Sequence, residues 1–237
     1  MSGEVPYKAH EYGDGNSDEI VALVAGFNGP VDNLEKAATD LVQSGRDAIV
    51  YTYHPRILLA GHGHLLPEFI DTLHEDFITR TSEYSRRRYG GVSLGGAIAV
   101  GMQKKDTDPE HGLYAATGIN AAELIMKQCV FRALILATHR IDVQRAFERN
   151  GHTLESLSNQ WQYVNVPPVT PFTVVLGGMD YVIQKRKIAR ELKIWHETNN
   201  NITVIHKPLL GHNGTIKWFN NNVMKLIEPD PAHPAFK

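Results

Sequence analysis

The chain has 237 residues, of which 42% are hydrophobic and 21% charged, and its formal net charge is −2. This composition is ordinary for a globular protein with one substantial core, and it leaves no long tract typical of disorder. The near-neutral charge excludes a general attraction to nucleic acid or to an acidic membrane surface, which favours a small-molecule partner. The single cysteine excludes an intramolecular disulfide.

The sequence predicts neither a signal peptide nor a membrane helix. The segment Met1–Asp18 is polar and lacks the apolar core of a signal peptide. No segment approaches the roughly 18 consecutive apolar residues that a membrane helix needs. We therefore expect a cytoplasmic protein without a membrane partner, and the sequence leaves a homo-oligomer open.

The first elements in chain order read as strand, helix and strand. The apolar run Ile20–Ala25 predicts a buried strand, and the β-branched and aromatic run Ala48–Tyr53 predicts a second one. Between them, Asp32 followed by Glu35 matches a capping box, and apolar residues at helical spacing predict a helix over about 33–44. A strand, helix and strand in succession form a crossover unit, which indicates a parallel sheet.

The same alternation continues along the chain and predicts a doubly wound, mostly parallel α/β sheet of about six or seven strands, with Glu4–Tyr12 available as a front strand. Between residues 121 and 166 the alternation stops, and we interpret this stretch as a helical cap inserted in a single domain spanning 1–237. The further expected strands are Tyr89–Val92, Leu113–Ile119, Phe172–Leu176 and Ile202–Ile205, and the further expected helices are Leu66–Thr81, Leu94–Gln103, Val182–Glu197 and Thr215–Ile227.

A G-x-S-x-G pentapeptide, Gly91–Gly95, lies between a predicted strand and a predicted helix, with Ser93 at its centre. A serine on such a sharp turn takes a strained backbone conformation, and side chains at the flanking positions would collide with their neighbours. Gly96 and Ala97 let the following helix lie close to the sheet. The motif in this context resembles the nucleophile elbow of the α/β-hydrolase superfamily.

The resemblance implies a carboxylate after a late strand and a histidine after the last strand, in the chain order serine, acid, histidine. Asp180 follows the strand Phe172–Leu176, and His212 lies between the last strand and the final helix. Both are expected at the carboxyl edge of the sheet, where ligands bind in such folds. The resemblance thus predicts Ser93 as nucleophile, His212 as base and Asp180 as the group that orients the histidine.

The resemblance also implies an oxyanion hole and a reaction. The amide of Leu94 and, from the turn after the first strong strand, the amide of Phe27 are the expected donors. The implied reaction is hydrolysis of an ester or related acyl bond on a small-molecule acyl substrate, without a cofactor or a metal, and the cap is expected to select the substrate. Two rivals remain open: other chemistry by the same triad, such as cleavage of a C–C bond or perhydrolysis, and a binding protein with little turnover.

Several residues compete for these roles. Ser93, Asp180 and His212 could each be an ordinary turn, cap or surface residue. Glu123 or Asp142 could replace the carboxylate from the cap, and His206 could replace the histidine, although its place at a strand end favours a structural role.

Two further features have no assigned role in the sequence. His62 and His64 offer two metal ligands without a third group to complete a site. The run Arg86–Arg88 is too short to indicate nucleic-acid binding. It either lies at the solvated end of a short strand or shows that the predicted strand register is wrong.

Overall fold

A computed structural model describes residues 7–27, 29–54, 65–117, 140–161, 170–182 and 202–227, together with 122, 126, 132–133, 135–137, 188, 190, 192–193 and 197. The strands are β1 (Tyr7–Tyr12), β2 (Glu19–Val24), β3 (Asp47–Tyr53), β4 (Arg86–Val92), β5 (Gly112–Ala115), β6 (Phe172–Gly177) and β7 (Ile202–Lys207). The helices are α1 (Asp32–Gln43), α3 (Leu65–Arg80), α4 (Leu94–Lys105), α7 (Val143–Arg149), α8 (Leu154–Gln160) and α11 (His212–Ile227).

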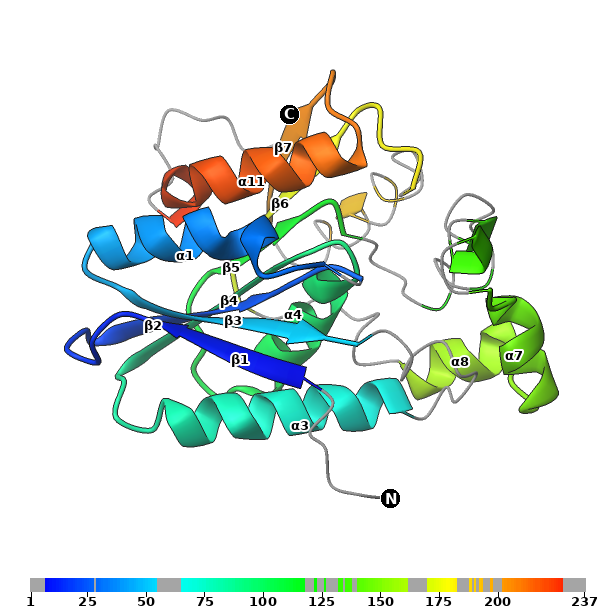
Figure 1. Ribbon diagram of the computed structural model, residues 1–237, viewed down its shortest axis with the longest axis horizontal. Helices are drawn as coiled ribbons and strands as arrows, with labels where there is room; N and C mark the ends of the chain where they lie inside the picture. Colours follow the sequence, from blue (N-terminus) through cyan, green and yellow to red (C-terminus); the bar gives the residue numbers. More distant parts are fainter. Residues whose placement is uncertain are drawn as a thin grey trace.

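The sheet has seven strands in the order β1-β3-β2-β4-β5-β6-β7. Only β1 runs antiparallel to its neighbour, β3, and the other pairs are parallel. Helices α1 and α11 lie together on one face of the sheet, and α3 and α4 lie on the other (Figure 1). The doubly wound, mostly parallel sheet predicted from the sequence is confirmed.

Burial on both faces explains why β2 is a continuous apolar run from Ile20 to Val24 rather than an alternating one. In β2, Ile20, Ala22 and Val24 face the cluster that includes α3 and α4. The intervening Val21 and Leu23 face the second cluster, to which α1 and α11 contribute. Helices therefore pack against both faces of the sheet, and the loops that leave its carboxyl edge start from strands that are held on both sides.

Three local predictions are wrong in detail. Asp32 lies inside α1 and caps nothing, because Val31 takes the N-cap position with helical φ and ψ of −56° and −35°. Strand β5 ends at Ala115 rather than continuing toward residue 119, since Ala116 adopts a positive φ of 47° that is incompatible with strand geometry. Helix α11 begins at His212 itself, three residues before the predicted start at Thr215.

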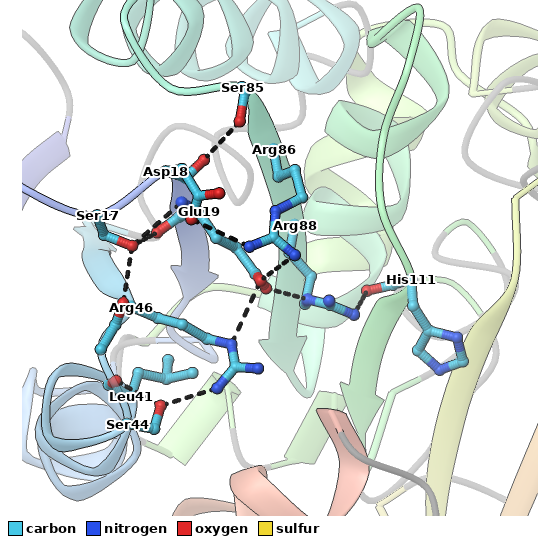
Figure 2. Close-up of polar contacts among 11 residues, drawn as sticks. Ser17, Asp18, Glu19, Leu41, Ser44, Arg46, Ser85, Arg86, Arg88 and His111 are labelled. Carbon is cyan, nitrogen blue, oxygen red and sulfur yellow. Dashed lines mark hydrogen bonds and ion pairs between the residues drawn. The ribbon is translucent and has the colours of Figure 1, made fainter.

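The arginine run lies inside the central strand β4, so the prediction of a short strand over 89–92 is wrong. Alternate residues of a strand point to opposite faces, and each face supplies a carboxylate. Arg86 and Arg88 both contact Glu19, the residue of β2 that pairs with Arg86 in the sheet register (Figure 2). Arg87 points the other way and binds both carboxylate oxygens of Asp106, at 2.9 and 3.2 Å. The run is thus a structural ionic cluster at the amino ends of the strands.

The proposed cap is described in part. Helices α7 and α8 lie within 121–166. The buried side chains of Phe147 in α7, Leu157 in α8 and Trp161, which follows α8, belong to the core cluster on the α3 and α4 face. The division into a single domain with an inserted cap stays a prediction. Most of the predicted helix Val182–Glu197 lies outside the described residues. Among the helices that the structure describes, none is long and apolar enough to cross a membrane.

Candidate active site

Ser93 lies on the turn between β4 and α4 with φ of 54° and ψ of −128°, a conformation that side-chain-bearing residues rarely adopt. Glycines make this turn sterically feasible. A Cβ on Gly91 would lie 2.5 Å from the carbonyl oxygen of Gly95, and one on Gly95 would lie 2.1 Å from that of Ala25. The strain is of a kind that concentrates at functional sites, and it holds the Ser93 hydroxyl above the carboxyl edge of the sheet.

The side chains of Ser93, His212 and Asp180 form a hydrogen-bonded series. The Nε2 atom of His212 lies 3.0 Å from Ser93 Oγ, and its Nδ1 lies 2.8 Å from Asp180 Oδ2. The other carboxylate oxygen of Asp180 accepts a 3.0 Å hydrogen bond from the backbone N–H of Val182. Three segments far apart in sequence therefore meet at the edge where their strands end.

The chemistry of the partners fixes the direction of these hydrogen bonds. An ionised carboxylate can only accept, so Nδ1 of His212 carries the proton that Asp180 accepts. In a neutral ring Nε2 is then the acceptor, and the hydroxyl of Ser93 donates to it. The arrangement can take a proton from Ser93 and hold the resulting imidazolium beside a negative charge.

The loops that carry Asp180 and His212 are bound to each other. The N–H of Gly178 donates to the carbonyl of Lys207 at 2.8 Å, and the N–H of Met179 donates to that of Leu210 at 3.0 Å. A Cβ on Gly178 would lie 2.3 Å from the carbonyl oxygen of Pro208, so only glycine permits this approach. The distance between the acid and the histidine is therefore set by backbone contacts as well as by their own hydrogen bond.

A cavity of about 680 Å³ opens beside Ser93 and His212. Its size falls within the range of about 300–1,000 Å³ that is usual for small-molecule sites. Phe27 lines this cavity, and the neighbouring Gly26 is so close to the nucleophile that an added Cβ would lie 3.1 Å from the Cβ of Ser93. Leu94 is the first residue of α4, where backbone N–H groups lack intrahelical acceptors. Of the two residues predicted for the oxyanion hole, Leu94 follows the serine directly in the chain, and Phe27 lines the same cavity as the serine.

The competing residues lie elsewhere or cannot be placed. His206 is an exposed residue of β7, whereas His212 contacts both the serine and the acid. Asp142 caps α7 by accepting a hydrogen bond from the N–H of Arg145. Glu123, His62 and His64 lie outside the described residues. Within the part of the chain that is described, no group of three or more His, Cys, Asp or Glu side chains is placed to hold a metal ion.

Sequence reasoning missed the large apolar side chains around the cavity. Met179 and Tyr181 flank Asp180, and Leu209 lies three residues before His212, and all three line the cavity. The signal was present in the sequence, since each is a large apolar or aromatic residue in a turn where polar residues are usual. The sequence-based expectation was that the cap selects the substrate, but no described residue of the cap lines this cavity.

Comparison with solved structures identifies the fold. The chain is similar to an α/β-hydrolase enzyme from a sediment metagenome of the Mar Chica lagoon, with 15% identity over 94% of this chain and 93% of that one and a TM-score of 0.62. A Pyrococcus furiosus esterase has 12% identity to this chain, over 94% of this chain and 90% of that one, with a TM-score of 0.62. A Bacillus megaterium epoxide hydrolase has 15% identity to this chain, over 94% of this chain and 97% of that one, with a TM-score of 0.57.

These likenesses show that the chain has the α/β-hydrolase fold. No protein-family model matches the sequence, and no curated protein matches it. At identities of 12–15% the comparisons establish architecture, and the reaction has to be argued from the site.

Proposed function

We propose that this protein is a serine hydrolase that cleaves an ester or related acyl bond through Ser93, His212 and Asp180. One observation carries the proposal: the hydroxyl, the imidazole and the carboxylate are in hydrogen-bond contact in series, at 3.0 and 2.8 Å. A serine hydroxyl is a weak nucleophile unless a base is within reach and a third group orients that base. The same elements in the same roles occur on several unrelated folds, so geometry is the proper criterion for them.

In the proposed first half of the reaction, Ser93 Oγ adds to the carbonyl carbon of the substrate while His212 Nε2 takes the hydroxyl proton. Asp180 stabilises the imidazolium that forms and keeps its Nδ1 proton in place. The imidazolium then gives its Nε2 proton to the leaving alcohol, and the acyl group remains on the serine.

In the second half, a water molecule loses a proton to His212 and attacks the acyl-enzyme, which releases the acid and restores the serine. Negative charge develops on the carbonyl oxygen in both halves. The amides of Leu94 and Phe27 are the proposed donors to this oxygen, and one such donor is typically worth about 3 kcal/mol of transition-state stabilisation.

Two features of the site support the assignment to acyl bonds: the open cavity and the serine nucleophile. The exposed mouth of the cavity lets water reach the acyl-enzyme, as hydrolysis needs. The structural neighbours include an enzyme described as an esterase, although another is described as an epoxide hydrolase, so the fold by itself does not choose the bond. The serine at the nucleophile position, hydrogen-bonded to a histidine, favours acyl transfer.

An active-site-directed fluorophosphonate tests the proposal without knowledge of the substrate. We expect stoichiometric labelling of the wild type, none of Ser93→Ala, and full labelling of the matched control Ser82→Ala, which changes an exposed serine of the turn after α3. Circular dichroism would show that each variant is folded. Failure of folded wild-type protein to label would favour a binding protein over an enzyme.

A further inference from the structure

Exposed large apolar side chains are concentrated at the proposed active site. Four such residues occur in the described chain, and three of them, Met179, Tyr181 and Leu209, line the cavity beside the nucleophile. They are 47%, 72% and 83% exposed. Single exposed apolar residues are common on proteins, but a group around one cavity marks a binding surface.

The backbone that carries these side chains is held in place. Met179 and Tyr181 flank Asp180, whose carboxylate is fixed by His212 and by the N–H of Val182. The N–H of Met179 also donates to the carbonyl of Leu210, the residue next to Leu209. The backbone positions that carry the apolar side chains are therefore set before any ligand arrives, which reduces the entropy lost on binding.

The described lining of the cavity offers no charge compensation for an ionic ligand. None of its lining residues among those described is Asp, Glu, Lys or Arg, and His212 is the one histidine among them. Further apolar lining comes from Phe27, Val182 and Ile216. A carboxylate or ammonium group entering here would lose hydration without meeting an oppositely charged side chain among the described lining residues, whereas a hydrocarbon chain would gain by burial.

We infer that Met179, Tyr181 and Leu209 are the specificity-determining residues and that they bind the apolar chain of an uncharged ester. The inference rests on the proposed serine hydrolase function. The loops after β6 and β7, which also carry the acid and the histidine, then select the substrate, in place of the cap expected from the sequence. The same short segments then perform the chemistry and choose the substrate.

A series of p-nitrophenyl esters from acetate to octanoate tests the inference. In the wild type, kcat/KM should rise about two-fold per added methylene, below the roughly four-fold of complete burial because the cavity is open. Leu209→Ser and Met179→Ser should each lower the ratio of kcat/KM for octanoate to that for acetate by about ten-fold. The matched control is Leu136→Ser, which changes a leucine that is 51% exposed and lines a different pocket, and its ratio should equal that of the wild type.

A second comparison tests the exclusion of charge. The wild type should prefer p-nitrophenyl butyrate to the p-nitrophenyl half-ester of succinate by at least about ten-fold in kcat/KM, because the free carboxylate meets no cationic Lys or Arg side chain among the described lining residues. A series of acetate esters from ethanol to octanol, followed by titration of the released acid, shows whether the chain on the loops belongs to the acyl or to the alcohol part.

The outcomes separate this inference from the function on which it rests. Length dependence in either series that is weakened in Leu209→Ser but kept in Leu136→Ser supports the inference. Ester hydrolysis that is independent of length in both series, or equally affected by all three variants, overturns it while leaving the hydrolase function intact. Absence of both hydrolysis and fluorophosphonate labelling would instead overturn the proposed function.

Discussion

Replacing Glu19 tests whether its carboxylate stabilises the arginines of the central strand β4. The Glu19 side chain is 2% exposed, and its Oε1 lies 2.9 Å from Nε of Arg88, which is 8% exposed. Its Oε2 lies 3.3 Å from Nε of Arg46 and 3.4 Å from a terminal nitrogen of Arg86 (Figure 2). Glu19→Leu removes the one carboxylate that these three guanidinium groups share, while the leucine keeps a similar volume.

The magnitude follows from how exposed each arginine is. Arg86 is 47% exposed and can be hydrated by water, so its pair is worth less than about 1 kcal/mol. Arg88 is buried and would keep only a 3.3 Å hydrogen bond to the carbonyl of His111. Breaking a buried ion pair by removing one partner typically costs about 3–5 kcal/mol. We expect Glu19→Leu to lose about 4 kcal/mol, a large part of the roughly 5–15 kcal/mol that stabilises an ordinary domain.

Urea denaturation measures this loss as a fall in the midpoint at constant slope. The double variant with Arg88→Leu should recover most of the loss, because the unpaired buried charge is gone. Glu11→Gln is the matched control. It breaks an ion pair with Arg80 that is shorter, at 2.7 Å, but solvent-exposed, and it should cost less than about 1 kcal/mol. A Glu19→Leu loss no larger than that of the control, or single-variant losses that simply add, would refute the reasoning.

Two further predictions concern a positioning residue and a partly buried histidine. Asp180→Asn should lower kcat by about 10⁴-fold with little change in stability, because an amide can donate to His212 and so favour the wrong tautomer; rates on p-nitrophenyl acetate check this. Burial, together with the charge of Arg88, lowers the pKa of His111 to about 4, below the roughly 6.5 of an unfolded histidine. The unfolded chain therefore binds a proton first as the pH falls, so stability should drop by up to about 3 kcal/mol between pH 6.5 and 4, and His111→Gln should flatten that part of a urea midpoint profile.

The parts of the site that were predictable depend on local rules. Gly91 and Gly95 indicate a tight turn at Ser93, because a side chain at either position would clash with the backbone. The order of strands places Asp180 and His212 at one edge of the sheet. The apolar run Ile20–Ala25 likewise predicted a buried strand, which β2 confirms.

The parts that were missed depend on contacts between distant residues. In the sequence, Arg88 interrupts the apolar pattern expected of a central strand. The structure pairs it with the carboxylate of Glu19, 69 residues away, and no local pattern signals that pairing. Asp32 matches a cap motif, but the chain already takes helical geometry at Val31. The turn at Ala116 needs a positive φ that alanine rarely adopts, so no residue pattern signalled it. Such tertiary constraints override local propensity.

The most direct test of the central claim is to find the acyl group on the enzyme. The protein is mixed with a p-nitrophenyl ester, quenched in acid during turnover and analysed by intact mass and peptide mapping. The account predicts one acyl group per chain, attached to Ser93. Rapid consumption of the ester with no acyl group on the protein, or with the group attached to another residue, would contradict it.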